Sequence, residues 1–375
     1  MSARVSIPAA GVNVDVPAVW LRLQCPCTEC FVPGIGERRV RLHELEVDLS
    51  PTAVDLDDAG NITVVWPDGH RSVYSPALLA RLVAGSNRRP VKEPVLWDGG
   101  HSIATVDHDA FWADTGVRAE SLERLRDEGT IVVTAMPTES GEVGRFLAGM
   151  GTAIREVPFA RIHDIVFALD GYNIAFTSDP LPPHTDLASY RWPPSGQLLH
   201  MLHNNAEGGH SIVVDGWSVV EGLRRDEPDA FEVLATTPVP HRIYSDSGET
   251  FARQPIIRLD HAGTVIGVRY SNQTLQPLPL DEPQIDAWYA AYRELSARVC
   301  DPANQTTRRL AAGDMLIVNG HRVLHGRTGF GGDEVHRHLQ DAYFEFDDVM
   351  SHLDRLRGDA PTDETSVTTA PTAGR

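Results

Sequence analysis

Short runs that alternate apolar and polar residues, each ended by turn residues, dominate the chain from Asn173 onward. Alternation places every second side chain on one face of an extended chain, so it predicts β-strands. The expected strands cover residues 211–214, 256–259, 265–270, 315–318 and 342–346. Residues 260–263, Asp-His-Ala-Gly, form the expected turn between the second and third strands. A series of short strands such as this favours a β-barrel or sandwich.

Apolar residues at spacings of three or four predict helices at residues 120–127 and 142–156, on either side of an expected strand at 130–136. A longer helix starts near Asp281 and should pack on the outside of the sheet. Its apolar stripe consists of Ile285, Trp288, Tyr292, Leu295 and Val299. It ends at Cys300, which we expect to be a lone buried thiol.

The N-terminal part has a different pattern, in which β-like runs such as residues 61–66 are followed by turns such as Pro-Asp-Gly at 67–69. It closes with a short helix that Ser75 should cap and Pro76 should begin. A chain of 375 residues can bury two cores. We therefore expect a small N-terminal domain over 1–88, a linker over 89–103 and a large domain over 104–358. The tail from 359 to 375, rich in Thr, Pro, Ala and Asp, should be disordered.

The formal net charge of −19 argues against nucleic acid as a partner, because a phosphate backbone is bound mainly through clustered Lys and Arg. No run of about 18 apolar residues occurs, so we expect no membrane span and a soluble, cytoplasmic protein. Three of the four cysteines, Cys25, Cys27 and Cys30, lie too close together for a disulfide framework. We interpret them as metal ligands.

The tripeptide His184-Thr185-Asp186 places an imidazole and a carboxylate on the same face of an extended strand. Two histidines and one carboxylate form a facial triad, which leaves adjacent coordination positions open on a non-haem iron for a co-substrate and O₂. The tripeptide alone is weak evidence, because residues 352–354, His-Leu-Asp, have the same form. That second copy lies in a predicted C-terminal helix, and we interpret it as structural.

Arginines downstream distinguish the first copy. His325 is followed by Arg327 and, twelve residues after the histidine, by Arg337. 2-Oxoglutarate chelates iron through its 1-carboxylate and 2-keto group, and its distal carboxylate suits a planar, bidentate arginine, for which we choose Arg337. By itself His325 could be a buried core histidine; beside the two arginines it is the expected third iron ligand.

These motifs occur in one order and spacing with several others, from residue 16 to residue 356. The others are residues 66–70 (WPDGH), 173–177 (NIAFT), 197–200 (QLLH), 208–209 (GG), 214–216 (VDG), 324–327 (LHGR) and 337–343 (RHLQDAY). The chain thereby resembles the γ-butyrobetaine hydroxylase and trimethyllysine hydroxylase branch of the taurine dioxygenase-like oxygenases. The resemblance implies a mainly β catalytic domain, a double-stranded β-helix or jelly-roll with flanking helices. It also implies use of Fe(II), 2-oxoglutarate and O₂, with release of succinate and CO₂ as a substrate is hydroxylated.

Position by position, the resemblance implies that His184, Asp186 and His325 hold the iron. It implies 2-oxoglutarate contacts from Asn173, Leu199 and Arg337, with Arg327 and Arg322 in supporting roles.

His70 is a fourth candidate metal ligand beside the three N-terminal cysteines. Three thiolates and one imidazole suit a closed, structural tetrahedral zinc site, and the same four positions match the zinc ligands of the family's N-terminal domain. Zinc would contribute directly to the folding of so small a module. In related enzymes this domain assists dimer contacts, so we predict a homodimer.

The positions expected to contact the substrate depart from the butyrobetaine enzymes. Those enzymes would have Tyr, Trp, Tyr and Tyr, an aromatic cage for a trimethylammonium group, where this chain has Phe159, His163, Phe176 and Tyr343. Leu187 replaces a tyrosine that helps to bind the substrate carboxylate, whereas Asn272 still matches a polar contact. His163 could form a hydrogen bond, carry a charge facing an anionic substrate, or be an ordinary surface or core histidine. We therefore favour hydroxylation of another small polar metabolite, amino acid-like or from specialised metabolism, with γ-butyrobetaine hydroxylation as the alternative.

Two other classes of protein fit the sequence less well. A catalytically inactive, metal-binding interaction protein would not need the intact triad and Arg337. A zinc hydrolase would need a general base, and no nearby Glu is placed for that role.

Overall fold

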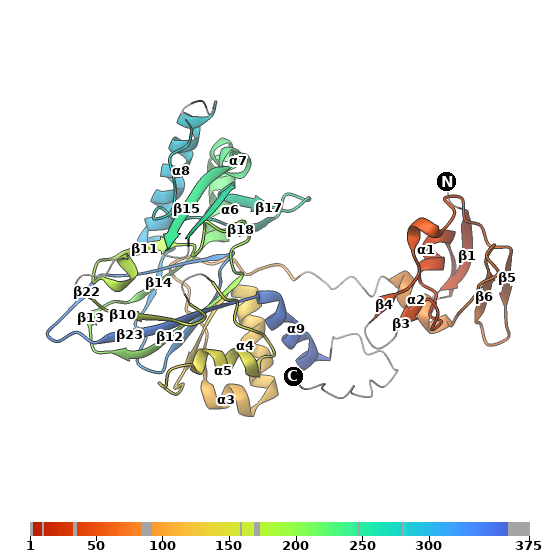
Figure 1. Ribbon diagram of the computed structural model, residues 1–375, viewed down its shortest axis with the longest axis horizontal. Coiled ribbons are helices and arrows are strands. Elements are labelled where there is room, and N and C mark those ends of the chain that lie inside the picture. Colours follow the sequence, from red (N-terminus) through yellow and green to blue (C-terminus); the bar gives the residue numbers. More distant parts are fainter. Residues whose placement is uncertain are drawn as a thin grey trace. The chain divides into compact units, whose positions relative to one another are not determined.

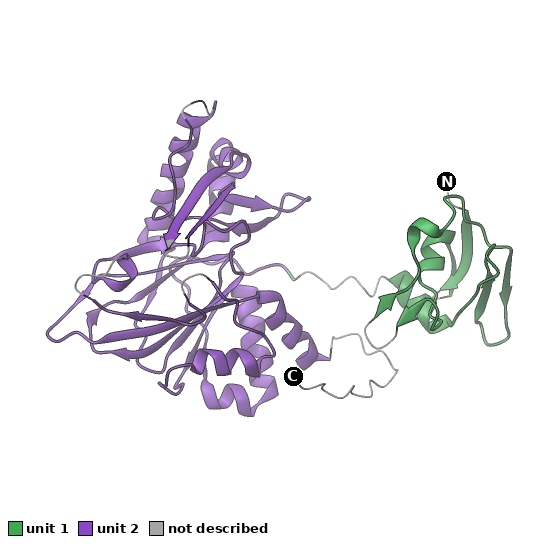
Figure 2. Ribbon diagram, viewed as in Figure 1, with its two compact units in different colours: residues 1–92, 361–375 green, residues 93–360 purple. Residues whose placement is uncertain are grey.

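The computed structural model describes residues 3–9, 11–32, 36–84, 92–157, 160–168, 173–245, 248–279, 281 and 283–358. The chain divides into two compact units, residues 1–92 with 361–375 and residues 93–360 (Figure 2). Trp97 and Ile103 are buried in the core of the second unit, so the later part of the expected linker belongs to that unit. The expected disordered tail, 359–375, lies outside the described residues.

The first unit is a small, β-rich module. Its elements are β1 (Arg4–Ala9), β2 (Val12–Pro17), α1 (Ala18–Leu23), β3 (Phe31–Val32), β4 (Glu37–Arg38), η1 (Leu42–Glu44), β5 (Ala53–Leu56), β6 (Ile62–Val65), β7 (Arg71–Tyr74) and α2 (Pro76–Ala84). Tyr74 is buried and donates a hydrogen bond of 2.7 Å to the Leu21 carbonyl, which ties the sheet to α1. As predicted, Ser75 caps α2, accepting a hydrogen bond from the Leu78 amide.

Two sheets form the frame of the second unit (Figure 1). The six-stranded sheet, in spatial order, consists of β10 (His163–Val166), β23 (Arg337–Phe344), β12 (Gly196–Asn204), β20 (Met315–Asn319), β9 (Thr130–Thr134) and β8 (Thr105–Asp107). The four-stranded sheet consists of β11 (Leu181–His184), β21 (Val323–Arg327), β14 (Ser211–Asp215) and β19 (Thr306–Arg308). Every described pairing in them is antiparallel except β8 with β9.

Alternation along the strands explains why the two sheets face each other. Leu199 of β12 and Val213 of β14 belong to one buried cluster between the sheets. Their neighbours Leu198 and Val214 belong to two different clusters on the outer faces. Each strand thus buries both faces, and the unit is the predicted jelly-roll sandwich with flanking helices.

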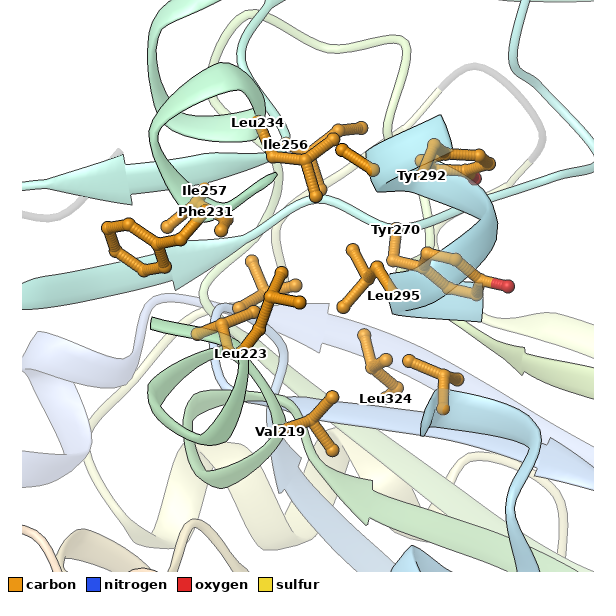
Figure 3. Close-up of a cluster of buried hydrophobic side chains, with 14 of the residues drawn as sticks. Val219, Leu223, Phe231, Leu234, Ile256, Ile257, Tyr270, Tyr292, Leu295 and Leu324 are labelled. Carbon is orange, nitrogen blue, oxygen red and sulfur yellow. The ribbon is translucent and has the colours of Figure 1, made fainter. Parts of the chain in front are cut away.

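Helices cover the outer face of each sheet. Against the six-stranded sheet pack α3 (His108–Ala113), α4 (Thr115–Glu128), α5 (Glu142–Gly149) and α9 (Phe346–Arg357). Against the four-stranded sheet pack α6 (Gly216–Asp226), α7 (Pro228–Thr236) and α8 (Ile285–Cys300), whose side chains meet around Leu324 of β21 (Figure 3).

The predicted stripe of α8 is confirmed, since Trp288, Tyr292, Leu295 and Val299 are buried. The prediction for Cys300 is wrong: it is exposed, because it follows Val299 and so lies off the buried stripe. The helix expected over 142–156 ends at Gly149, and Gly151 turns the chain away with a φ of +73°.

Shorter elements complete the second unit. They are η2 (Ile174–Phe176), β13 (Glu207–Gly208), β15 (Val239–Ser245), β16 (Gly248–Gln254), β17 (Ile257–Leu259), β18 (Val265–Val268), η3 (Pro302–Asn304) and β22 (Phe330–Gly331). The predicted turn between β17 and β18 is confirmed by the hydrogen bond from the Gly263 amide to the Asp260 carbonyl, at 3.1 Å. No helix in the described part of the chain is long and apolar enough to span a bilayer.

Candidate active site

His184, Asp186 and His325 meet where β11 and β21 pair. His184, the last residue of β11, lies opposite His325 in the antiparallel register, and their ring centroids are 4.7 Å apart. Asp186 follows β11, with Oδ1 3.1 Å from Nε2 of His184 and Oδ2 3.6 Å from Nε2 of His325. One donor atom from each residue lies within 4.8 Å of the other two. The structure therefore brings together the three residues that the sequence predicted as iron ligands.

Hydrogen bonds orient these side chains. Nδ1 of His184 lies 2.9 Å from the Pro182 carbonyl oxygen, which can only accept, so Nδ1 carries the proton and Nε2 is left to bind. Gln197 and Tyr343 each donate a hydrogen bond of 2.8 Å to Oδ2 of Asp186. Hydrogen bonds to the protein itself thus fix the orientation of the His184 ring and of the Asp186 carboxylate.

Burial and neighbouring side chains also shift the pKa values of these three residues. Although burial opposes it, the neighbouring imidazoles of His325 and His184 hold the pKa of Asp186 well below its usual range. Burial lowers the pKa of His325 to about 4. For His184 burial acts against protonation, but the hydrogen bond with Asp186 raises its pKa. An ionised carboxylate and a neutral imidazole are the forms that bind metals.

A pocket that opens to solvent extends from this cluster between the two sheets. His184, Asp186 and His325 line it, and so do Leu199 and Arg337. Asp186 is the most accessible of the three predicted ligands, with its side chain 26% exposed.

The two arginines of the pocket differ in how their donors are used. Arg327 donates to the backbone carbonyls of Ile174, Thr177 and Asp179, so it holds the segment around η2. Arg337 is 5% exposed, its Nε has no hydrogen-bond partner, and it forms no ion pair among the described residues. Burial lowers the pKa of Arg337 to about 10, with Arg327 nearby as a second cause. A buried guanidinium of this kind calls for an anion.

A second cluster lies in the first unit. Nε2 of His70 is 3.3 Å from Sγ of Cys25, 3.6 Å from Sγ of Cys27 and 3.4 Å from Sγ of Cys30. Arg22 donates a hydrogen bond of 3.1 Å to Sγ of Cys30. The four residues predicted as zinc ligands are therefore brought together.

The other predicted contacts are more scattered. Asn173 caps η2 through its side chain, and Asn272 is hydrogen-bonded to Tyr270 and Tyr292. Neither lines the pocket. Leu187, with a φ of +51°, is buried against Tyr343.

The remaining predicted substrate residues are Phe176 and Phe159. Phe176 lies within η2, next to the pocket residue Ala175. Phe159 lies outside the described residues. The second tripeptide, with His352 and Asp354, lies on α9 as expected and is not among the metal-type clusters of the described residues.

Comparison with known proteins decides the family. The model described as "Taurine catabolism dioxygenase TauD, TfdA family" matches residues 96–343, and the one described as "Gamma-butyrobetaine hydroxylase-like, N-terminal" matches residues 7–80. The chain belongs to the TauD/TfdA family. It is accordingly a dioxygenase, of a family that depends on iron and 2-oxoglutarate.

Relatives within this family cover nearly the whole chain. The chain is 33% identical over 342 residues to gamma-butyrobetaine dioxygenase of Pseudomonas sp. (strain AK-1), covering 89% of this chain and 88% of that protein. It is 27% identical over 347 residues to mitochondrial trimethyllysine dioxygenase of Gallus gallus, covering 89% and 81%. Among solved structures, an asparagine oxygenase in complex with Fe(II), 2S,3S-3-hydroxyasparagine and succinate matches with a TM-score of 0.49 and 19% identity, covering 64% of this chain and 82% of that one. This last likeness is too distant to bear on the substrate.

In this TauD/TfdA member, the sequence analysis assigned no role to the pocket residue Asp341, although the motif 337–343 contains it. It is 3% exposed, lines the pocket, and lies opposite His163 in the β10–β23 register. A signal was present: Arg337, Asp341 and Tyr343 are separated by even numbers of residues, so on one strand they share a face. Gln197, which joins Asp341 to Asp186, was noticed only as part of a motif.

Proposed function

We propose that this dioxygenase binds Fe(II) through His184, Asp186 and His325 and uses 2-oxoglutarate and O₂ to hydroxylate an unactivated C–H bond of a small polar metabolite. Succinate and CO₂ are the co-products. The observation that carries the proposal is that Arg337, buried without an anionic partner among the described residues, lines the same pocket as the three ligand atoms.

The three side chains fit a metal of this kind. Two metal–ligand bonds of about 2.1 Å that meet at a right angle place their donor atoms about 3.0 Å apart. The separation between His184 and Asp186 is 3.1 Å, and that between His325 and the other Asp186 oxygen is 3.6 Å. Two imidazoles and one carboxylate are also the donor set that leaves iron with open positions.

The pocket also fits 2-oxoglutarate. Its distal carboxylate would pair with Arg337, and Leu199 would form an apolar wall beside its methylene groups. Arg327 would act indirectly, because its donors hold the segment around η2. Asn173 would act in the same way, through the cap it provides for η2.

When bound, the iron centre couples oxidative decarboxylation of 2-oxoglutarate to oxidation of the substrate. The chain's own residues position the proposed iron ligands and shield them from water. Gln197 and Tyr343 fix the orientation of Asp186, and the burial of His184 and His325 keeps bulk water from the ligand atoms.

Hydroxylation of γ-butyrobetaine is the second candidate. It is supported by the names of the relatives and by Tyr343, which matches an expected position of the aromatic cage. Against it stands His163 at another cage position, because imidazole is a weaker partner for a quaternary cation than an indole ring. An inactive, metal-binding interaction protein is disfavoured, since it would have no use for Arg337.

We further propose a structural zinc ion held by Cys25, Cys27, Cys30 and His70. A tetrahedral zinc with bonds of about 2.3 Å to sulfur and 2.0 Å to nitrogen separates sulfur from nitrogen by about 3.5 Å. The three distances from the His70 nitrogen, 3.3, 3.6 and 3.4 Å, match this separation.

Uncoupled turnover tests the proposed activity. With Fe(II), 2-oxoglutarate and O₂ but no substrate, the protein should release succinate slowly, and an Arg337→Met variant should release far less at the same co-substrate concentration. The absence of succinate from an iron-loaded wild-type sample would favour the inactive alternative. A metabolite screen for faster succinate release then identifies the substrate, and light scattering tests the predicted homodimer. A cytoplasmic location and the domain boundary at 88 remain predictions.

A further inference from the structure

Asp341 is a buried carboxylate that the proposed iron and co-substrate chemistry does not use. It lies on the inner face of β23, between Leu339 and Tyr343, and lines the pocket. Only 3% of the residue is exposed. A buried carboxylate is costly unless it is well paired, so its retention in a pocket wall needs a reason.

Two side chains hold Asp341 in place. Nδ1 of His163 lies 2.8 Å from Oδ1 as an ion-pair partner, and the Gln197 amide donates a hydrogen bond to Oδ2 at 3.1 Å. An ionised carboxylate accepts about four hydrogen bonds, so each oxygen keeps room for a further donor. Since Asp341 lines the pocket, that donor can come from a bound molecule.

Neither arginine of the pocket serves as that partner. Arg327 donates to backbone carbonyls. Arg337 and Asp341 lie on the same face of β23 and four residues apart, which corresponds to about 13 Å along a strand. The pocket thus presents a cation at one end, assigned above to the distal carboxylate of 2-oxoglutarate, and an anion farther along the same wall.

The described pocket wall offers little to a quaternary ammonium. Such a cation has no N–H and is stabilised by aromatic faces. Among the described residues that line this pocket there is no Phe, Tyr or Trp. Tyr343 lies beside it, but its hydroxyl is hydrogen-bonded to Asp186 and its ring meets the edge of His163. The ring of Phe330 already forms cation–π contacts with the guanidinium groups of Arg327 and Arg337.

We propose that Asp341, positioned by His163 and Gln197, is the specificity-determining residue, and that it selects a substrate with an N–H-bearing ammonium group over its quaternary counterpart. The inference rests on the proposed function, because it assumes that the substrate enters the pocket that holds iron and 2-oxoglutarate. A protonated amine donates a charge-assisted hydrogen bond to Asp341, which a trimethylated nitrogen cannot do.

The test compares two matched pairs of probes: 4-aminobutyrate with γ-butyrobetaine, and lysine with trimethyllysine. Binding is measured by calorimetry on the full chain, loaded anaerobically with Fe(II) and 2-oxoglutarate. In at least one pair the primary amine should bind the wild type about tenfold or more tightly than its trimethylated partner. Tighter or equal binding of the trimethylated member in both pairs overturns the inference, and so does the absence of binding by all four probes.

Three variants test whether Asp341 is the source of the preference for the amine. Asp341→Asn should reduce the preference for the amine to near unity. Asp164→Asn is the matched control: it removes the same charge from the neighbouring position on β10, where Asp164 is half exposed and pairs with His338. His163→Gln, which keeps a donor for Asp341, should retain the preference. Because the preference is a ratio between two probes on one sample, partial loss of fold or iron lowers both affinities and leaves it unchanged.

The two possible failures are distinguishable. If the wild type does not bind 2-oxoglutarate in the presence of Fe(II), the proposed function fails and the inference falls with it. If 2-oxoglutarate binds but the amine is not preferred, or if Asp341→Asn keeps the full preference, the inference alone is wrong.

Discussion

The hydroxyl of Tyr343 donates a hydrogen bond of 2.8 Å to Oδ2 of Asp186. This bond joins a residue of the six-stranded sheet to the predicted iron carboxylate that follows β11. Groups that orient a metal ligand in this way commonly change metal affinity 10- to 100-fold when they are removed. The predicted place of Tyr343 in the aromatic cage is therefore only part of its role.

Tyr343→Phe removes that hydrogen bond and keeps the ring that packs against Val157 and Leu187. We predict that Fe(II) affinity falls by about tenfold, measured by anaerobic metal titration. Tyr190→Phe, in the same cluster, is the matched control and should keep the affinity of the wild type. Unchanged iron binding by Tyr343→Phe would show that Asp186 does not need this donor.

Arg337→Lys keeps the positive charge and loses the planar pair of donors. The KM for 2-oxoglutarate should rise by about 10- to 100-fold while the protein remains folded. Arg327→Lys should act differently, because Arg327 binds three backbone carbonyls: the melting temperature should fall. If Arg327→Lys alone raised the KM, the two roles would have to be exchanged.

The zinc proposal predicts that the purified chain carries about one zinc, and that Cys30→Ser lowers the content below about half and unfolds the first unit. Cys300→Ser is the control, since Cys300 is exposed and belongs to the second unit. Elemental analysis and circular dichroism give the two measurements. A zinc-free wild type with a folded first unit would refute the assignment.

Two buried histidines make stability depend on pH. His200 and His241 are fully buried, and neither ring has a hydrogen-bond partner among the described residues. Burial lowers the pKa of His200 to about 4 and that of His241 to about 3. In the unfolded chain a histidine takes up a proton below about pH 6.5, whereas in the folded protein these two remain neutral. Stability should therefore fall as the pH drops below about 6.5, by roughly 2 kcal/mol per histidine at about pH 5.

Thermal unfolding of the apoprotein between about pH 7 and pH 5 measures this slope. His200→Leu should flatten it, whatever its effect on the melting temperature at neutral pH. His261→Gln changes a histidine in the exposed turn after β17 and should leave the slope as it is. Equal slopes for His200→Leu and the wild type would contradict the prediction.

Local pattern was sufficient to predict the long helix α8 and the turn between β17 and β18. Of the ten described strands in the two sheets it predicted β9, β14 and β20, whose apolar residues follow one another along the strand. It failed on β23, which was expected to begin at residue 342 and begins at Arg337. Arg337 and Asp341 break the apolar alternation because this strand turns them into the pocket. Gln340 breaks it on the opposite face, where its amide donates to Ser140 and Asp164.

The partner of Asp341 could not be predicted from local pattern either. Its contact with His163 depends on the register between β10 and β23, two strands far apart in the sequence. Likewise, the spacing of His184 and Asp186 does not indicate which histidine completes the cluster, because His325 comes from a different strand.

Anaerobic titration of the full chain with Fe(II) in the presence of 2-oxoglutarate tests the central claim most directly. The wild type should develop a weak visible charge-transfer band that saturates at about one iron per chain. His352→Ala, which changes the histidine of the second tripeptide, should give the same band, and His184→Ala should give none. A full band from His184→Ala would contradict the assignment of the iron site.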